Sequence, residues 1–303
     1  MELSGIVFVQ VLIIFVLMAL GFVLAKTGVI NDDGTKQMTD ILLVVVTPCV
    51  LIRAYQMDFS FELVKNLMIA AGLSLLVHII GILLCTILFR KEETLHYRID
   101  IFASVYSNCG FMAIPLLTAA MGTDGVFYGS AYLAVFTILY WTHGICVYSG
   151  NLKELSFKKI ITNPGIIGTL IALLLFAFGI KLPYVLASGV DYMADINTPL
   201  AMIVMGAYLT KVDFKKALKN SKLYLVTAIR LIIFPMITIA AARLLKIAAT
   251  ISRSIIISSA CPTAAVSALL ATKYRLDSTY AAEIVSVCTL LSVATIPLIL
   301  MLY

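Results

Sequence analysis

Charged residues are scarce in this chain: Asp, Glu, Lys and Arg make up only 13% of its 303 residues, whereas 62% are hydrophobic. Soluble domains carry about 25% charged residues, so this composition indicates an integral membrane protein. Low-complexity tracts are also missing, and the net charge is a modest +6, spread over short loops. This distribution argues against nucleic acid as a partner and is typical of topology signals beside a lipid bilayer.

The motifs of several enzyme classes are absent as well. The chain has no GxxxxGK[ST], no GxSxG and no HExxH, and its membrane acids lack the pairing that an aspartyl protease needs. The six cysteines form no CxxC and lie in apolar runs, as buried small side chains do. The N-terminal segment lacks a basic start and a cleavage site, so we interpret it as a first span. We therefore expect no enzyme activity, no cofactor and no metal.

What the chain does have is a series of long apolar segments. A bilayer core about 30 Å thick needs about 20 apolar residues per helix. Segments that meet this length are 5–25, 38–56, 66–89, 99–120, 125–148, 160–180, 192–210, 223–245, 254–272 and 279–301. With the N-terminus outside, most of the 22 Lys and Arg residues fall in inner loops, as the positive-inside rule requires. The sequence predicts an all-α polytopic protein of ten transmembrane helices in the cell membrane, both termini outside.

The two halves of the chain resemble each other. One shift along the sequence places Asp40 on Asp195 and Arg98 on Arg253, charges that lie at the ends of predicted spans. If each half is one unit, each unit has five spans, and the odd number inverts the second copy in the membrane. Inverted repeats of this kind are a recurring plan of secondary transporters, whose substrates bind near the midplane at broken helices.

The fourth and ninth spans carry the expected breaks. Asn108 lies about 15 Å into the fourth span, at about 1.5 Å per residue, and the same shift places it on Thr263 beside Pro262. Proline frees backbone groups, which a membrane tolerates only inside protein or beside a wet cavity. Exposed N–H groups at a half-helix start would attract an anion. The substrate-binding candidates here are Asn108, Cys109, Gly110, Pro115, Pro262 and Thr263.

These residues carry a family resemblance. The chain resembles the auxin efflux carrier family in its fourth-span signature, "SNCGFMAIPLL" (107–117), and in its ninth-span signature, "ACPTAAVSALLATKYRLD" (260–277). Its last segment, "LLSVATIPLILML" (290–302), is similar to the closing helix of that family. The resemblance covers essentially the whole chain.

The resemblance implies a 5+5 inverted repeat in which broken helices 4 and 9 cross at the site. Residues 1–148 and 160–303 would be the repeats, joined by a cytoplasmic linker at 149–159. Helices 1, 2, 6 and 7 would form a scaffold, helices 3–5 and 8–10 a transport part, and helices 2 and 7 a homodimer contact. The short linker favours a prokaryotic-type member that carries a small carboxylate such as malate or malonate. Ser267, where plant carriers often have a second proline, argues against auxin itself.

Ionisable residues inside predicted spans are functional candidates, because they are costly in a bilayer. Arg230 would balance a carboxylate substrate or pair with a buried acid, or else snorkel to the interface. Glu283 would accept a coupling proton or be an interfacial carboxylate. His143 and His78 are interpreted as core histidines or as members of a proton relay. Asp195 is interpreted as a charge at a helix N-terminus.

Two functions follow from these patterns. The first is a secondary carrier of a small organic anion that works by alternating access at the crossing of helices 4 and 9. The alternative is a membrane receptor or a channel-like protein that uses the same cavity without coupled transport. A binding protein would not need two matched breaks, whereas alternating access uses two equivalent halves.

Overall fold

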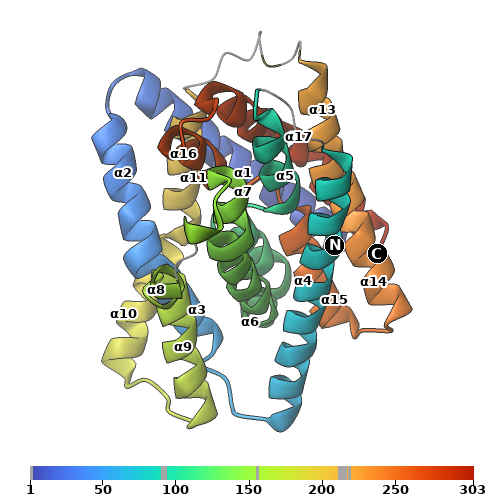
Figure 1. Ribbon diagram of the computed structural model, residues 1–303. Helices are drawn as coiled ribbons and strands as arrows, with labels where there is room; N and C mark the ends of the chain where they lie inside the picture. Colours follow the sequence, from blue (N-terminus) through green and yellow to red (C-terminus); the bar gives the residue numbers. More distant parts are fainter. Residues whose placement is uncertain (1–2, 90–93, 155–156, 211–216, 218–219) are drawn as a thin grey trace.

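The computed structural model describes residues 3–89, 94–154, 157–210, 217 and 220–303, which form the helical bundle of Figure 1. The first half contains α1 (Leu3–Lys26), α2 (Asp32–Ile41), η1 (Leu42–Val46), α3 (Thr47–Ala54), α4 (Phe61–Leu88), α5 (His96–Val105), η2 (Cys109–Ala113), α6 (Ile114–Leu139), η3 (Tyr140–Gly144), α7 (Ile145–Ser149) and η4 (Leu152–Glu154). The second half contains α8 (Phe157–Ile161), α9 (Pro164–Ala177), α10 (Tyr184–Asp195), α11 (Asn197–Leu209), α13 (Ser221–Ala228), η5 (Ile229–Ile233), α14 (Phe234–Leu244), α15 (Ala249–Ala260), α16 (Val266–Lys273) and α17 (Ser278–Met301). Residues 155 and 156 of the predicted linker lie outside the described ranges.

Six helical stretches in the described part of the chain are long and apolar enough to cross a membrane. They are Gly5–Lys26, Asp32–Ala54, Phe61–Leu88, Cys109–Ser149, Ser221–Leu244 and Ser278–Met301. The 41-residue stretch is interrupted at Gly122, whose φ of 63° and ψ of −146° are not helical. The prediction of an all-helical, multi-pass membrane protein is confirmed, and the count of ten spans stays a prediction.

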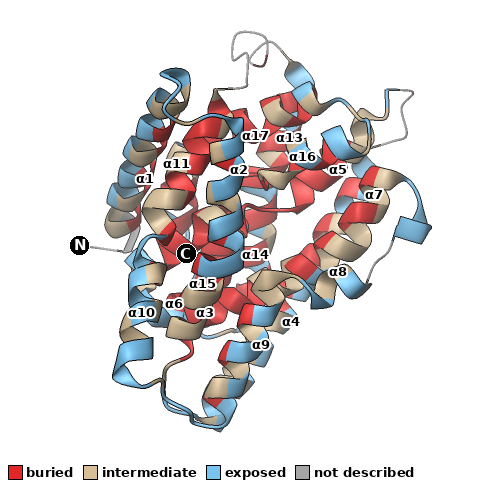
Figure 2. Cartoon of the chain, turned by 90° about the vertical axis from the view of Figure 1, so that its left-hand side faces the viewer, coloured by how far each residue is buried: buried red, intermediate tan, exposed pale blue. Residues whose placement is uncertain are grey.

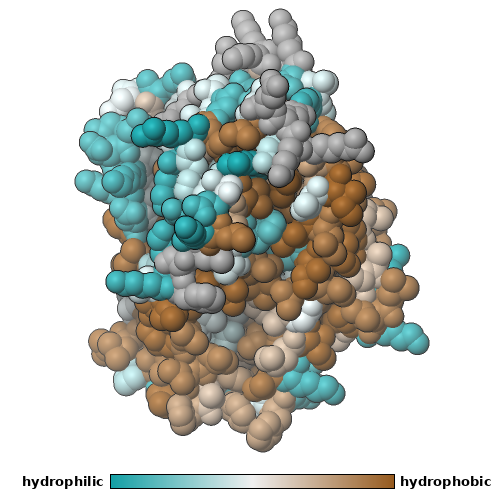
Figure 3. Space-filling view, viewed as in Figure 1, coloured by the Kyte–Doolittle hydropathy of each residue, from teal (hydrophilic) through white to brown (hydrophobic). Residues whose placement is uncertain are grey.

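The surface of the bundle matches this membrane setting. Buried residues gather in the interior of the bundle, while the outer helices turn many exposed residues outward (Figure 2). Figure 3 shows that hydrophobic residues cover most of the lower part of this face, while hydrophilic residues gather towards the top. Many large apolar side chains are exposed at the surface of the protein, among them Val16, Leu83 and Leu174. In water such a surface would be unfavourable, but it suits contact with lipid tails.

Three prolines inside helices follow π-helical segments. Pro48 comes two residues after η1, Pro115 two residues after η2, and Pro235 two residues after η5. A proline inside a helix has no N–H to donate and its ring collides with the carbonyl one turn earlier. The wider π turn takes up this conflict, so each helix continues past its proline. Such π turns occur often at functional sites, and η2 and η5 both lie at the site described below.

Glycines bring α1 and α11 into direct backbone contact. A Cβ atom on Gly206 would overlap the main chain at Met18, and one on Gly21 would overlap the main chain at Ile203. Membrane helices associate by such close packing of small residues, because lipid tails remove the hydrophobic drive between them. A similar contact joins α9 to α3, where Gly168 faces Pro48.

Replacing Gly206 by Leu should therefore separate α1 from α11. The new side chain meets backbone, which cannot move aside, so we expect a loss of stability of about 1–3 kcal/mol or more. Thermal unfolding and size-exclusion profiles of the purified protein would measure it. Gly72→Leu on α4 is the matched control, because nothing lies within 4 Å of a Cβ at Gly72. Equal melting temperatures for the two variants would contradict the packing described here.

Candidate functional site

Two helix breaks meet near the centre of the molecule. The first separates α5, which ends at Val105, from η2, which begins at Cys109, and Tyr106 in the gap has an extended backbone. The second separates α15, which ends at Ala260, from α16, and its first residue is the extended Cys261. The breaks thus fall at the positions that the sequence predicts. The residues of both gaps are buried, with the exception of the half-buried Ala265.

The main chains of the two breaks pair with each other. The Asn108 N–H donates to the Pro262 carbonyl at 2.7 Å, and the Ala264 N–H donates to the Tyr106 carbonyl at 2.9 Å. These two bonds frame an antiparallel bridge between Ser107 and Thr263. Backbone groups freed in a membrane need partners within the protein. Here each break supplies the partners of the other.

Arg230 satisfies the helix ends beside this bridge. Its Nη1 donates to the carbonyls of Ser104 and Val105 at 3.2 and 2.7 Å, and its Nη2 donates to the carbonyl of Ser259. These carbonyls belong to the last turns of α5 and α15, which carry the negative ends of the helix dipoles. The guanidinium also lies 4.1 Å from the ring centre of Phe234, and Arg230 is 0% exposed. The side chain therefore caps two half-helices inside the protein and does not reach an interface.

Thr263 completes the caps at the end of α5. Its Oγ1 donates to the Ala103 carbonyl at 2.8 Å, and its N–H donates to Cys288 Sγ at 3.4 Å. Three consecutive carbonyls of α5, at residues 103–105, are thus bound by side chains from the second half of the chain.

Asn108 begins the half-helix that follows the first break. It is 5% exposed, and its Nδ2 donates to Met205 Sδ on α11 at 3.5 Å. A thioether is a weak acceptor, so this amide donor has a poor partner. Cys109 beside it is buried, and Gly110 has open space around it, because a Cβ at Gly110 would meet only a Leu133 methyl group, at 4.0 Å.

The remaining candidates lie around this centre. His143 Nδ1 is 2.9 Å from the Tyr106 hydroxyl, which also donates to the Leu139 carbonyl at 3.0 Å. His143 is therefore linked to the first break through one side chain. His78 lies against the Tyr132 ring, 4.8 Å between centres. Glu283 is buried on α17, a helix that packs against α15, α16 and η5. Within the described residues, no group of three His, Cys, Asp or Glu side chains is placed to hold a metal ion.

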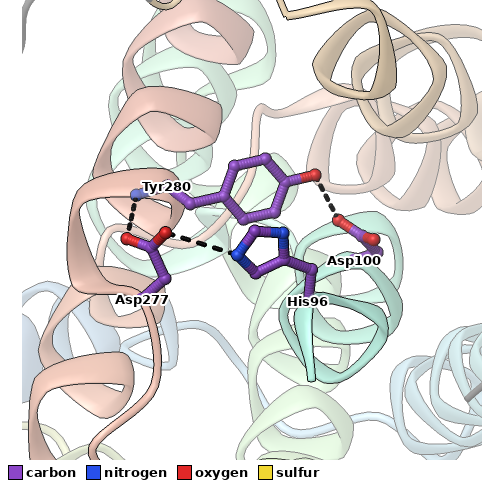
Figure 4. Close-up of polar contacts among 4 residues, drawn as sticks. All are labelled: His96, Asp100, Asp277 and Tyr280. Carbon is purple, nitrogen blue, oxygen red and sulfur yellow. Dashed lines mark hydrogen bonds and ion pairs between the residues drawn. The ribbon is translucent and has the colours of Figure 1, made fainter. Parts of the chain in front are cut away.

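One polar cluster, between α5 and the start of α17, was not predicted from the sequence. Figure 4 shows His96 and Asp100 of α5 beside Asp277 and Tyr280 at the start of α17. The Tyr280 hydroxyl donates to Asp100 Oδ1 at 2.7 Å, and His96 Nε2 lies 3.3 Å from Asp277 Oδ2. The His96 and Tyr280 rings stack at 4.4 Å. Asp100, an acidic residue inside the predicted span 99–120, was the one feature of the sequence that could have pointed to this cluster. The cluster fastens the first half-helix of the broken α5 segment to α17.

The fold and the paired breaks define a multi-pass membrane protein built around two interrupted helices. Comparison with known proteins identifies the class: residues 6–300 match the model of the membrane transport protein family. The chain therefore belongs to this family, that of the auxin efflux carriers, as the fourth- and ninth-span signatures predict.

Two archaeal proteins are similar to the chain over most of their length. An uncharacterized transporter of Methanocaldococcus jannaschii is 25% identical and aligned over 95% of this chain and 96% of the relative. An uncharacterized transporter of Methanothermobacter thermautotrophicus is 22% identical, with 95% of each chain aligned. Both relatives are described as transporters, which agrees with the expectation that the chain is not an enzyme.

Replacing Arg230 by Met should loosen both helix breaks. The change keeps a flexible, unbranched side chain but leaves three buried carbonyls without their donors, each at a cost of about 1–3 kcal/mol. We expect a lower melting temperature and faster amide hydrogen exchange in the segments around residues 105–108 and 261–265.

Arg243→Met is the matched control for this variant. Arg243 also donates to a backbone carbonyl, that of Leu302 at 2.6 Å, but it is exposed to solvent or lipid. If both arginine variants unfold at the same temperature and exchange alike, Arg230 does not hold the breaks together.

Proposed function

We propose that the protein is a secondary carrier of a small organic anion, with a mono- or dicarboxylate such as malate or malonate as its substrate. The substrate would bind where the two helix breaks cross, and alternating access would expose this point to each side of the membrane in turn. Membership of a transport family supports the carrier class. The substrate class comes from the chemistry of the crossing and from the family resemblance.

The observation that carries this proposal is the environment of Asn108. Its amide donor lies in a helix break, at the start of a half-helix whose N–H groups favour negative charge. Its present partner is the weakly accepting sulfur of Met205. A carboxylate would be a much stronger acceptor, because charge-assisted hydrogen bonds are about twice as strong as neutral ones. Asn108 is 5% exposed, so access to it requires that helices move apart.

The packing of the helices supports a ten-span, 5+5 inverted repeat with repeats at 1–148 and 160–303. In such a repeat, a contact between spans 1 and 7 has a symmetry mate between spans 6 and 2. The corresponding helices do pack in pairs: α1 contacts α11, and α9 contacts α3. Likewise α1 contacts α17, and its mate is the contact of α9 with α6. This symmetry supports two equivalent halves that exchange roles across the membrane.

The same arrangement assigns a scaffold and a moving part. The scaffold would contain α1, α2, α3, α9, α10 and α11, and glycine contacts join α1 to α11 and α9 to α3 within it. The transport part would contain α4 to α7 and α13 to α17. We further propose a plasma-membrane location with both termini outside, and a homodimer contact through the predicted helices 2 and 7. Glu283 and His143 are the candidates for coupling to an ion.

Uptake into proteoliposomes tests the carrier directly. Labelled malate and malonate would be offered to the purified protein with and without an inward proton gradient. We expect saturable uptake that falls at least about tenfold in Asn108→Ala, because the substrate loses a charge-assisted hydrogen bond. Asn151→Ala, in an exposed loop, is the control and should transport like the unmodified protein.

The result separates the two functions. Equal loss of uptake and of folded protein in Asn108→Ala would reduce Asn108 to a folding residue. Ligand-induced thermal stabilisation without any uptake would favour the alternative, a receptor or channel-like protein that uses the same cavity.

A further inference from the structure

A polar cavity lies beside α6, the helix that follows the first break. It has a volume of about 70 Å³, enough for a few water molecules or a carboxylate group. Its walls come from three parts of the bundle, α3, α6 and the junction of α10 with α11, and its lining residues are Val50, Arg53, Ile114, Thr118, Ala194, Asp195, Asn197 and Thr198. In the proposed repeat, it lies between the scaffold and the transport part.

Asn197 is the feature of this cavity that points to a ligand. The side chain is 2% exposed and lines the cavity. Within the described residues, neither its Oδ1 nor its Nδ2 has a hydrogen-bond partner. Buried amides in folded proteins are almost always bonded, because leaving one unpaired is costly. An amide that opens onto a cavity with both functions unused is a recognition group for a polar ligand.

Arg53 supplies a positive charge at the edge of the same cavity. Its Nη1 donates to Asp195 Oδ1 at 2.6 Å, and this is the one hydrogen bond that the Arg53 side chain makes within the described part of the chain. The guanidinium carries five N–H donors in a fork that suits a carboxylate. Asp195 itself is 69% exposed. An ion pair so exposed contributes little energy and can exchange its acid for another.

We propose that this cavity is a carboxylate subsite, in which the ligand replaces Asp195 at the Arg53 guanidinium and is held by the Asn197 amide. The apolar side chains of Val50, Ile114 and Ala194 would face the carbon skeleton of a short ligand. The inference rests on the proposed function for its ligand class and deepens it: a carboxylate would be selected here before or after it passes the crossing. Because Ile114 and Thr118 belong to the half-helix that follows Asn108, movement of that helix would reshape the subsite.

Equilibrium binding of labelled malonate to the full protein in lipid nanodiscs tests this site. Arg53→Gln and Asn197→Ala should each weaken binding about tenfold, since each removes a direct bond to the carboxylate. Asp195→Asn should have the opposite effect and tighten binding about twofold to fivefold, because it removes the competing acid. A variant that merely misfolds cannot bind more tightly, so this gain is the sharpest outcome.

Lys181→Gln is the matched control. Lys181 also forms an exposed ion pair, with Asp58 Oδ1 at 3.1 Å, but it does not line the cavity. Malonate binding should be unchanged in this variant, and uncharged malonamide should not compete with malonate.

Parallel uptake measurements distinguish this inference from the carrier proposal. Malonate binding with the predicted variant pattern but without transport would overturn the carrier and keep the subsite. Transport by the unmodified protein, with binding that Asn197→Ala does not weaken and Asp195→Asn does not tighten, would overturn the subsite and keep the carrier. Absence of malonate binding to the unmodified protein would also overturn the subsite.

Discussion

The structure depends on one constraint: inside a membrane, every backbone N–H and C=O must find a partner within the protein. A continuous helix meets this requirement by itself, but a broken one does not. The gap at 106–108 and the gap at 261–265 meet it jointly, through the bonds from Asn108 to Pro262 and from Ala264 to Tyr106. Each break is tolerated only because the other lies against it.

Arg230 extends this mutual dependence to the helix ends. A single guanidinium binds carbonyls of α5 and α15, so one positive charge faces the negative ends of two helices. Its own segment, η5, is a π turn that leads into Pro235, and the guanidinium rests on the Phe234 ring. Three segments that are distant in the sequence are therefore fixed by one side chain. Both terminal nitrogens of this guanidinium are thus bound to backbone carbonyls of the protein.

Local signals in the sequence predicted part of this arrangement. Hydrophobicity and the shortage of charge identified the membrane class, and Asn108, Pro262 and Thr263 marked the breaks, because polar and helix-breaking residues are conspicuous in apolar runs. The family signatures overlapped these same residues. Contacts between distant segments were harder to foresee. The partners of Arg230 are backbone carbonyls, which every residue possesses, so no residue pattern could single them out.

Two further features, the ion pair of Asp195 and the glycine contacts between helices, could not be predicted from the sequence. The sequence predicts that Asp195 is a charge at a helix N-terminus; it ends α10, two residues before α11 begins, and the sequence did not predict its ion pair with Arg53. The close contact at Gly21 and Gly206 was not predicted either. The chain has 17 glycines, and only the packed structure shows which of them face another main chain.

The pairing of the breaks also bears on the order in which the protein is made. Synthesis proceeds from the N-terminus at about 5–20 residues per second, so the first break is complete on the order of ten seconds before the second one exists. During that interval the carbonyls at 103–105 and the Asn108 N–H lack the partners that they have in the finished protein. The newly made first half must hold these groups near water, or against the insertion machinery, until the second half arrives. Assembly in the bilayer must therefore finish late, because residues in the last third of the chain supply the partners that allow the first break to be buried.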